Sequence, residues 1–515
     1  MAAMEKGDIS SSGSGMKRLA VRRMWRLLVI VLFEAVINKS LFHDLEHAFL
    51  MSLVYCPQPY PPKCPEGSVL KDDQCVAEPP DSERWSFSAH CANRREVINR
   101  GRNIGATMGS LAHVGHLFAV FVLGPLVDIW GRKPLIVMSL CAAFVRSGMQ
   151  WEASRVTGRK YQHLIVIAAS LLANMADNLH PAAKAMVADL SPKQQEERAA
   201  AFVTVGFVGA GSTGLGFIGG YFILKMALTS YTLVWLGSAI AGLLAAILAF
   251  ILLEESKPQE VTDQYALQQG SDGSKKRGLR SVFCEKFSDT CAVYAGFLRN
   301  PLLLQMFLWI LVDTFTYPAN HLAKDVLLGP LHYSQSAASV LGILNPVLEC
   351  VGAGISAVLV RRLGMYGVLG VAMGLRVLAL LLVGLTVPML AVGAEAFFWS
   401  GVVLGGVSRG MGGPVLHTVF SMQVEGSEQG RLFSLMQVME VVGSLLGIQV
   451  FVKRLYNSDW TGWQAGTAFF LAAEISLFLM LWLARIARTQ EGERSGGESG
   501  EWDESDESDG SDTSE

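Results

Sequence analysis

Long apolar runs separated by short polar turns make up most of this chain. Each run has about the 20 residues that a helix needs to cross a lipid bilayer. We expect twelve helices, over residues 27–54, 103–127, 134–151, 162–188, 199–224, 231–253, 301–321, 337–360, 365–387, 391–419, 432–452 and 465–484. The pattern predicts an all-α membrane protein with twelve transmembrane helices in two six-helix bundles.

Composition agrees with a membrane protein. Only 17% of the residues are charged, against about 25% in soluble domains. The net charge of −3 hides a split, because residues 491–515 alone carry −10. The rest of the chain is therefore about +7, which suits a protein beside anionic lipid headgroups.

The apolar runs divide the chain into five parts. We expect a basic cytosolic tail over residues 1–26, a first bundle over 27–253 with a long outer loop at 55–102, a cytosolic linker over 254–300, a second bundle over 301–488, and an acidic tail over 489–515. The first apolar run is too long for a cleavable signal peptide and reads as a signal anchor. The acidic tail cannot bury apolar area, so we expect it to be disordered; it either solvates the protein or binds a cytosolic partner.

Positive charge predicts the orientation. With both termini in the cytosol, the cytosolic segments hold 23 Lys and Arg, whereas the outer segments hold 14. Half of those 14 lie in the long loop after the first helix, which can cross the membrane regardless of its charge. The sequence therefore predicts a multi-pass protein of the plasma membrane or an endomembrane, with both termini in the cytosol.

The chain also repeats itself. Gly131 and Gly364 each end a polar turn after an apolar run, and Arg198 and Arg431 each follow an acidic stretch. Both pairs are separated by 233 positions. Two landmarks at one offset indicate two six-helix halves related as parallel repeats.

One turn carries the most specific motif in the chain. Gly124-Pro-Leu-Val-Asp128-Ile-Trp-Gly131-Arg132-Lys133 lies between the second and third predicted helices. Its glycines allow close backbone approach, and Asp128 can face the positive end of another helix. The motif resembles the signature loop of the major facilitator superfamily, and this resemblance implies a secondary transporter that works by alternating access.

The resemblance also implies how this turn acts as a conformational latch. Asp128 would face the start of helix 11 near Arg431, and Arg132 would pair with an acidic residue of the helix 4–5 region. The latch residues that we expect are Gly124, Asp128, Gly131, Arg132, Lys133, Asp189, Glu197, Arg198 and Arg431. Asp189 and Glu197 are alternative partners of Arg132, and the second copy has Arg361 where the first has Asp128.

Ionisable residues inside apolar spans usually face a water-filled cavity. Helices 1, 4, 7 and 10 line the central cavity in the superfamily, so the resemblance favours residues on these helices for binding the substrate or a proton. They are Glu34, Asn38, Asp177, Lys184, Asp313, Tyr317, Asn320 and Arg409. In helix 4, Asn174, Asp177, Pro181 and Lys184 would share one face at helical spacing.

Four of the eight cysteines lie in the outer loop: Cys56, Cys64, Cys75 and Cys91. On the non-cytosolic side they imply two disulfides, and three pairings remain open.

A narrower resemblance is to the proton-coupled folate transporter group. It rests on an acidic residue in the first helix, the D-x-x-G-R-K-P-L turn, and Glu425-x-x-Glu-Gln-Gly-Arg-Leu-Phe433. It implies import of an anionic organic solute together with protons. An efflux antiporter and a transport-inactive receptor or scaffold are the alternatives. Antiporters of the superfamily have a helix 5 motif with a Gly-Pro pair before a Gly-Gly pair. This chain has Gly219-Gly220 but lacks the proline, which disfavours an efflux antiporter.

No phosphate-binding loop, zinc-protease helix or convincing nucleophile elbow occurs in the sequence. We therefore expect no enzyme activity, no cofactor and no metal. The basic clusters lie beside the membrane, so we expect no nucleic-acid partner.

Overall fold

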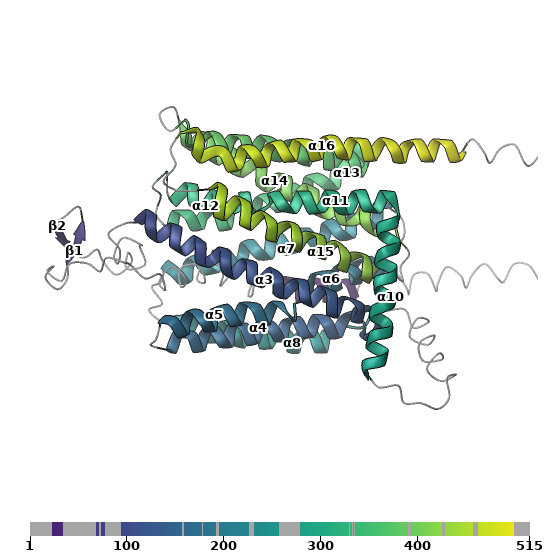
Figure 1. Cartoon of the computed structure of the whole chain (residues 1–515), viewed down its shortest axis with the longest axis horizontal. Helices are drawn as coiled ribbons and strands as arrows, with labels where there is room; N and C mark the ends of the chain where they lie inside the picture. Colours follow the sequence, from purple (N-terminus) through teal and green to yellow (C-terminus); the bar gives the residue numbers. More distant parts are fainter. Residues whose placement is uncertain are drawn as a thin grey trace, which may run out of the picture.

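The computed structural model describes residues 23–33, 68–71, 74–77, 94–156, 159–177, 179–191, 195–225, 231–256, 279–328, 330–331, 333, 335–389, 393–424, 428–456 and 462–498. Most of helix 1 and the first 22 residues lie outside this part, together with the predictions that fall on them. Figure 1 shows long helices side by side in one bundle, with α10 (Leu279–Arg299) crossing one end. We call this the linker end.

The helices of the first half follow the predicted order. A helix over residues 23–33 is followed by α3 (Arg94–Trp130), α4 (Arg132–Arg155), α5 (Arg159–Asn174), α6 (Leu179–Leu190), α7 (Gln195–Lys225) and α8 (Tyr231–Leu252). The second half contains α11 (Pro301–Thr316), α12 (Pro318–Leu328), α13 (Gln335–Leu385), α14 (Ala394–Ser421), α15 (Gln429–Gly447), the π-helix η6 (Ile448–Leu455) and α16 (Trp463–Glu498).

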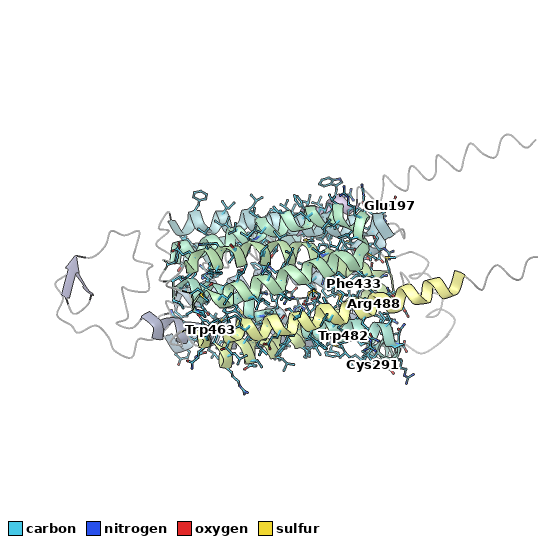
Figure 2. All side chains as sticks on the ribbon, turned by 90° about the horizontal axis from the view of Figure 1, so that it is seen from above. Glu197, Cys291, Phe433, Trp463, Trp482 and Arg488 are labelled. Carbon is cyan, nitrogen blue, oxygen red and sulfur yellow. The ribbon has the colours of Figure 1, made fainter. Side chains whose placement is uncertain are left out.

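Within the described residues, seven helices are long and apolar enough to cross a membrane. The exposed side chains of α8 agree with that role, because Leu233, Ile240, Ile247 and Ile251 are all more than 40% exposed. An apolar stripe at helical spacing that faces outward is suited to lipid. Figure 2 shows such side chains projecting around the bundle.

Two predicted helices form one long element at the centre of the second half. Gly364, with φ 68° and ψ 176°, interrupts α13. The parts of α13 before and after it both pack on α14, since Gly410 lies against Glu349 and Gly401 lies against Val383. The chain therefore reverses at Gly364, as the predicted turn between helices 8 and 9 requires.

Helix 4 is not the continuous helix that we predicted over 162–188. It breaks into α5 and α6, with residues 175–178 between them. Pro181 has no backbone N–H to donate, so it is tolerated in the first turn of α6 but not in the middle of a longer helix. Asp177 accepts a hydrogen bond from the backbone N–H of Leu179 at 3.2 Å and so caps α6. The predicted single-face stripe through Asn174 and Lys184 is therefore wrong.

Helix 7 is interrupted less than helix 4, because Tyr317 keeps helical dihedral angles of φ −57° and ψ −41°. It ends at Thr316 and resumes at Pro318 as α12, with Tyr317 at the junction. The proline ring clashes with the preceding turn, which ends the first segment. Helix 11 changes instead from α15 into the π-helix η6.

Three further features lie outside the predicted spans. The linker contains α10, whose moderate apolar content gave no transmembrane signal. The outer loop contains a hairpin, β1 (Ser68–Lys71) paired antiparallel with β2 (Gln74–Ala77). Helix α16 continues to Glu498, ten residues into the segment assigned to the acidic tail. Once a helix is nucleated, each added residue costs little, because it also gains a hydrogen bond.

Candidate functional site

The first latch turn is built around Gly131. This residue has φ 93°, a left-handed conformation that favours glycine. The carboxylate of Glu255 lies against it, where a Cβ would overlap the side chain. Glu255 accepts hydrogen bonds from the backbone N–H groups of Arg132 at 2.9 Å and Lys133 at 3.2 Å. A carboxylate at a helix N-terminus is stabilised by the helix dipole, so Glu255 holds the start of α4.

A buried ion pair lies beside this turn. Arg132 Nε is 3.1 Å from Asp189 Oδ2, and the two side chains are 2% and 5% exposed. Ser256 donates to the same carboxylate oxygen at 3.1 Å. Of the two predicted partners, the structure therefore places Asp189 at Arg132, whereas Glu197 is exposed. The surroundings of Gly124 and the side chain of Asp128 lie outside the described part.

The segment after α8 joins the same cluster to the first helix. Arg23 Nε lies 2.8 Å from Glu254, and Arg26 also pairs with Glu254. These two hydrogen bonds hold the pKa of Glu254 below its ordinary value. Residues 254–256 therefore connect the start of the linker to helix 1, α4 and α6.

The two halves contact each other at the linker end. Arg198 of α7 donates to the carbonyl oxygen of Ser421, the last residue of α14, at 2.9 Å. The Phe202 and Phe433 rings lie 5.9 Å apart, with His417 beside both. These contacts join α7 of the first half to α14 and α15 of the second. The described part of the linker end is therefore closed.

A cross-half ion pair lies on the neighbouring helices. Lys184 Nζ of α6 is 3.5 Å from Glu440 Oε1 of α15, and both side chains are about one-fifth exposed. Lys184 was a predicted cavity residue, but its partner was not. Arg431 lies in the first turn of α15, where the latch prediction placed it.

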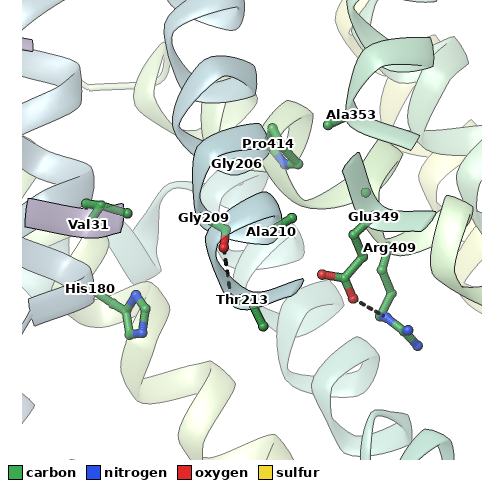
Figure 3. Close-up of a pocket in the computed structure, with 11 residues that line it drawn as sticks. Val31, His180, Gly206, Gly209, Ala210, Thr213, Glu349, Ala353, Arg409 and Pro414 are labelled. Atoms are coloured by element: carbon green, nitrogen blue, oxygen red, sulfur yellow. Dashed lines mark hydrogen bonds and ion pairs between the residues drawn. The ribbon is translucent and has the colours of Figure 1, made fainter. Parts of the chain in front are cut away.

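A cavity of about 280 Å³ lies between the halves. It is lined from the first half by Val31, His180, Gly206, Gly209, Ala210 and Thr213, and from the second by Glu349, Ala353, Arg409, Gly410 and Pro414. Figure 3 shows Glu349 and Arg409 on one wall and His180 on the other. Arg409 Nε donates to Glu349 Oε1 at 2.8 Å. Small residues form the rest of the wall on α7.

The other predicted cavity residues are not among those that line this cavity. Asp313 pairs with Arg376, which also donates to the Thr316 hydroxyl at 2.6 Å. Tyr317 lies at the α11–α12 junction with its ring edge against His321 at 5.2 Å. Asn320 donates its backbone N–H to the Tyr317 carbonyl oxygen at 3.0 Å. Asp177 caps α6 and lies 3.9 Å from the ring of His116.

Several predictions fall outside the described side chains. These are Glu34 and Asn38 of helix 1, and Cys56, Cys64, Cys75 and Cys91 of the outer loop. Of these residues, only the backbone of Cys75 is described, in β2. Cys141, Cys291 and Cys350 are not disulfide-bonded.

Four residues that form ion pairs or hydrogen bonds at these sites were not among the predicted site residues: Glu255, Glu349, Arg376 and Glu440. One signal was available. A buried charge is costly without an opposite charge beside it. Each Lys or Arg in an apolar span is therefore expected to pair with a carboxylate at the same depth in the membrane. Pairing the charges by depth would have selected Glu349 and Glu440.

Both the family model and the solved structures similar to this chain are those of membrane transporters. The family model described as the Major Facilitator Superfamily matches residues 101–319. The human organic anion transporter MFSD10 aligns with 90% of this chain and 99% of its own, at a TM-score of 0.58 and 15% identity. The proton:xylose symporter XylE from E. coli aligns over 90% and 95%, at a TM-score of 0.61 and 12% identity. A bacterial homologue of the iron transporter ferroportin aligns over 90% and 99%, at a TM-score of 0.59 and 11% identity. At these identities the structural likeness establishes the fold.

Proposed function

We propose that this chain, which belongs to the major facilitator superfamily, imports a small organic anion together with protons by alternating access. It is a transporter rather than an enzyme. The similar proteins are named for different solutes: organic anions, xylose and, for the homologue of ferroportin, iron. The substrate class therefore has to be argued from the cavity of this chain. The predicted resemblance to the proton-coupled folate transporter group points the same way.

The observation that carries the proposal is the Arg409–Glu349 pair in the cavity between the halves. The pair uses Nε of Arg409 and one oxygen of Glu349. The guanidinium carries further N–H donors in a planar fork, which suits a carboxylate or phosphate. The cavity volume fits a small solute.

The same pair provides proton coupling. A proton from the outer solution binds Glu349, and its carboxyl group becomes neutral. Arg409 then loses its counter-charge, and an anionic group of the substrate takes that place. Proton and anion thus bind together and leave together. Release of the proton on the other side re-forms the Arg409–Glu349 pair and displaces the anion.

Alternating access follows from the contacts at the linker end. We place this end in the cytosol, in agreement with the predicted excess of Lys and Arg. The Arg198–Ser421 and Lys184–Glu440 contacts then close the inner side of the cavity. Rocking of the halves has to break both contacts for the substrate to be released inside.

The test uses purified protein in vesicles that contain a pH-sensitive dye. Mono- and dicarboxylates are first screened by thermal shift at several pH values, and those that stabilise the protein are added outside. We expect the lumen to acidify as the anion enters. Glu349→Gln should abolish acidification while the thermal shift persists. Proton movement opposite to the solute would instead indicate an antiporter, and no stabilising anion would contradict the proposed substrate class.

A further inference from the structure

The second half contains a turn that matches the first latch turn in backbone conformation. Gly364 follows Gly131 by 233 positions, and both residues have positive φ with ψ 176°. The side-chain surroundings differ. The carboxylate of Glu255 lies against Gly131, whereas among the described residues nothing lies within 4 Å of a Cβ placed on Gly364. The second turn therefore lacks the acidic segment that covers the first.

A pocket of about 550 Å³ lies beside this second turn. It is bounded by the Gly364 turn, the C-terminal end of α14 and the α16 segment around Ala484, and three methionines line it: Met365, Met422 and Met480. Met365 and Met422 occupy the positions that correspond, at the 233-residue offset, to Arg132 and Asp189. The buried ion pair of the first half is thus replaced by flexible apolar side chains, which pack well against aromatic rings.

Three exposed arginines are close in the sequence to residues that line the pocket. Arg361 and Arg362 precede Gly364 and are exposed. Arg488 is also exposed, one residue beyond Ala487, which lines the pocket. It stands at the position that corresponds to Glu255. Figure 2 shows Arg488 on α16, beyond Trp482 toward the linker end. The second half therefore has a mainly apolar pocket with exposed Arg361, Arg362 and Arg488 nearby in the sequence, where the first half holds an acidic segment. We call these three residues the arginine rim.

We propose that residues 499–515 of this chain dock at that pocket, with Trp502 among the methionines and the acidic residues on the arginine rim. This segment contains eight Asp and Glu and no Lys or Arg. Trp502 is its one large apolar residue. The composition is complementary to the pocket in both respects.

The position of the chain end allows the contact. Helix α16 lines the pocket and ends at Glu498, eleven residues past Ala487. At about 1.5 Å per helical residue this is roughly 16 Å. Four extended residues reach about 14 Å, and the indole side chain spans the remainder. The acidic residues after Trp502 then lie over Arg361 and Arg362.

The experiment uses the full-length protein in lipid nanodiscs, with Trp502 replaced by the photo-crosslinking residue benzoylphenylalanine. We expect crosslinks to peptides that contain Met365, Met422 or Met480, identified by mass spectrometry. Charge reversal of Arg361 and Arg362 to Glu should lower their yield about threefold or more, as loss of two exposed charge pairs implies. The matched control, reversal of Lys453 and Arg454 in η6, should leave the yield unchanged.

Four results would overturn the proposal. Crosslinks to lipid alone would make the pocket a lipid site. Crosslinks only between differently tagged copies would make the contact intermolecular. Crosslinks confined to other helices, or a crosslink yield unchanged by the arginine reversal, would show that residues 499–515 do not dock at this pocket. None of these readouts depends on transport, so the proposed function can fail separately.

Discussion

The polar contacts between the two halves and the ion pairs within the second half differ in which half supplies each partner. Lys184 and Glu440 join the two halves, and the Arg198–Ser421 hydrogen bond does the same. Arg409–Glu349 and Arg376–Asp313 instead lie within the second half. Contacts between halves must break when the halves rock, whereas contacts within one half can persist. In the proposed mechanism, the contacts between the halves set the conformational equilibrium, and the Arg409–Glu349 pair binds the substrate.

The largest effect is expected at the cavity. Arg409→Ala should leave Glu349 without its partner and remove the anion-binding fork, so transport should fall by about 100-fold or more, in keeping with the several kcal/mol lost when one buried partner is removed. Initial uptake of a stabilising anion at matched surface expression measures this. Arg409→Lys is the control that keeps the charge. Normal uptake by the alanine variant would show that Arg409 does not bind the substrate.

The latch pair should affect stability rather than substrate binding. Arg132→Ala leaves Asp189 buried without its ion-pair partner, which is expected to cost about 3–5 kcal/mol. Thermal unfolding in detergent should show a drop of several degrees in Tm. The exposed Arg155–Glu152 pair provides the control, because Arg155→Ala should change Tm little. Equal shifts in both variants would mean that burial of the latch pair is not what stabilises the turn.

The cross-half pair should shift the balance of conformations by a smaller amount. Lys184→Gln with Glu440→Gln removes a partly exposed pair, worth about 1 kcal/mol, or roughly a fivefold change in the ratio of open to closed linker ends. Spin-label distances between the ends of α7 and α14 report that ratio. If the distribution is unchanged, the pair does not hold the halves together.

The smallest effect concerns pH. The pKa of Glu254 is held below its ordinary value of 4.5 by hydrogen bonds from Arg23 and Arg26. A carboxylate whose folded pKa is lowered stabilises the fold fully above its ordinary pKa, and the contribution is lost as pH falls through the folded pKa. The Tm difference between the wild-type protein and Glu254→Gln should therefore be small near neutral pH and vanish on acidification. A difference that grows toward acid pH would contradict this assignment.

Apolar periodicity and the 233-residue offset predicted the helical bundle and both turns. Bilayer thickness requires long apolar runs, and a sharp reversal of the backbone favours glycine, so both features can be recognised in the sequence. The Gly131 and Gly364 turns have matching conformations, as the repeat required. The breaks at residues 175–178 and at Tyr317 were missed, although Pro181 and Pro318 were visible. Polar residues lie at both breaks, among them Asp177 and Asn320, but they were interpreted as cavity-facing positions of unbroken helices.

The site was less predictable than the fold. Asp189 was one of two partners predicted for Arg132, and burial distinguishes it from exposed Glu197. Glu349 and Glu440 lie on helices that the family pattern does not assign to the cavity, yet they pair with the predicted residues Arg409 and Lys184. Such pairs depend on helix rotation and depth, which a single sequence specifies weakly.

The break in helix 4 has a mechanical consequence. With 12 residues, α6 is about 18 Å long, little more than half the thickness of the hydrocarbon core. It carries Lys184 and is joined to α5 by a short junction, in which Met175 still donates to Leu171 while Ala176 and Asp177 donate to carbonyls only three residues back. We expect this short helix to tilt while α5 stays fixed in its bundle, so that the linker end would open by movement of α6 before either half turns as a whole.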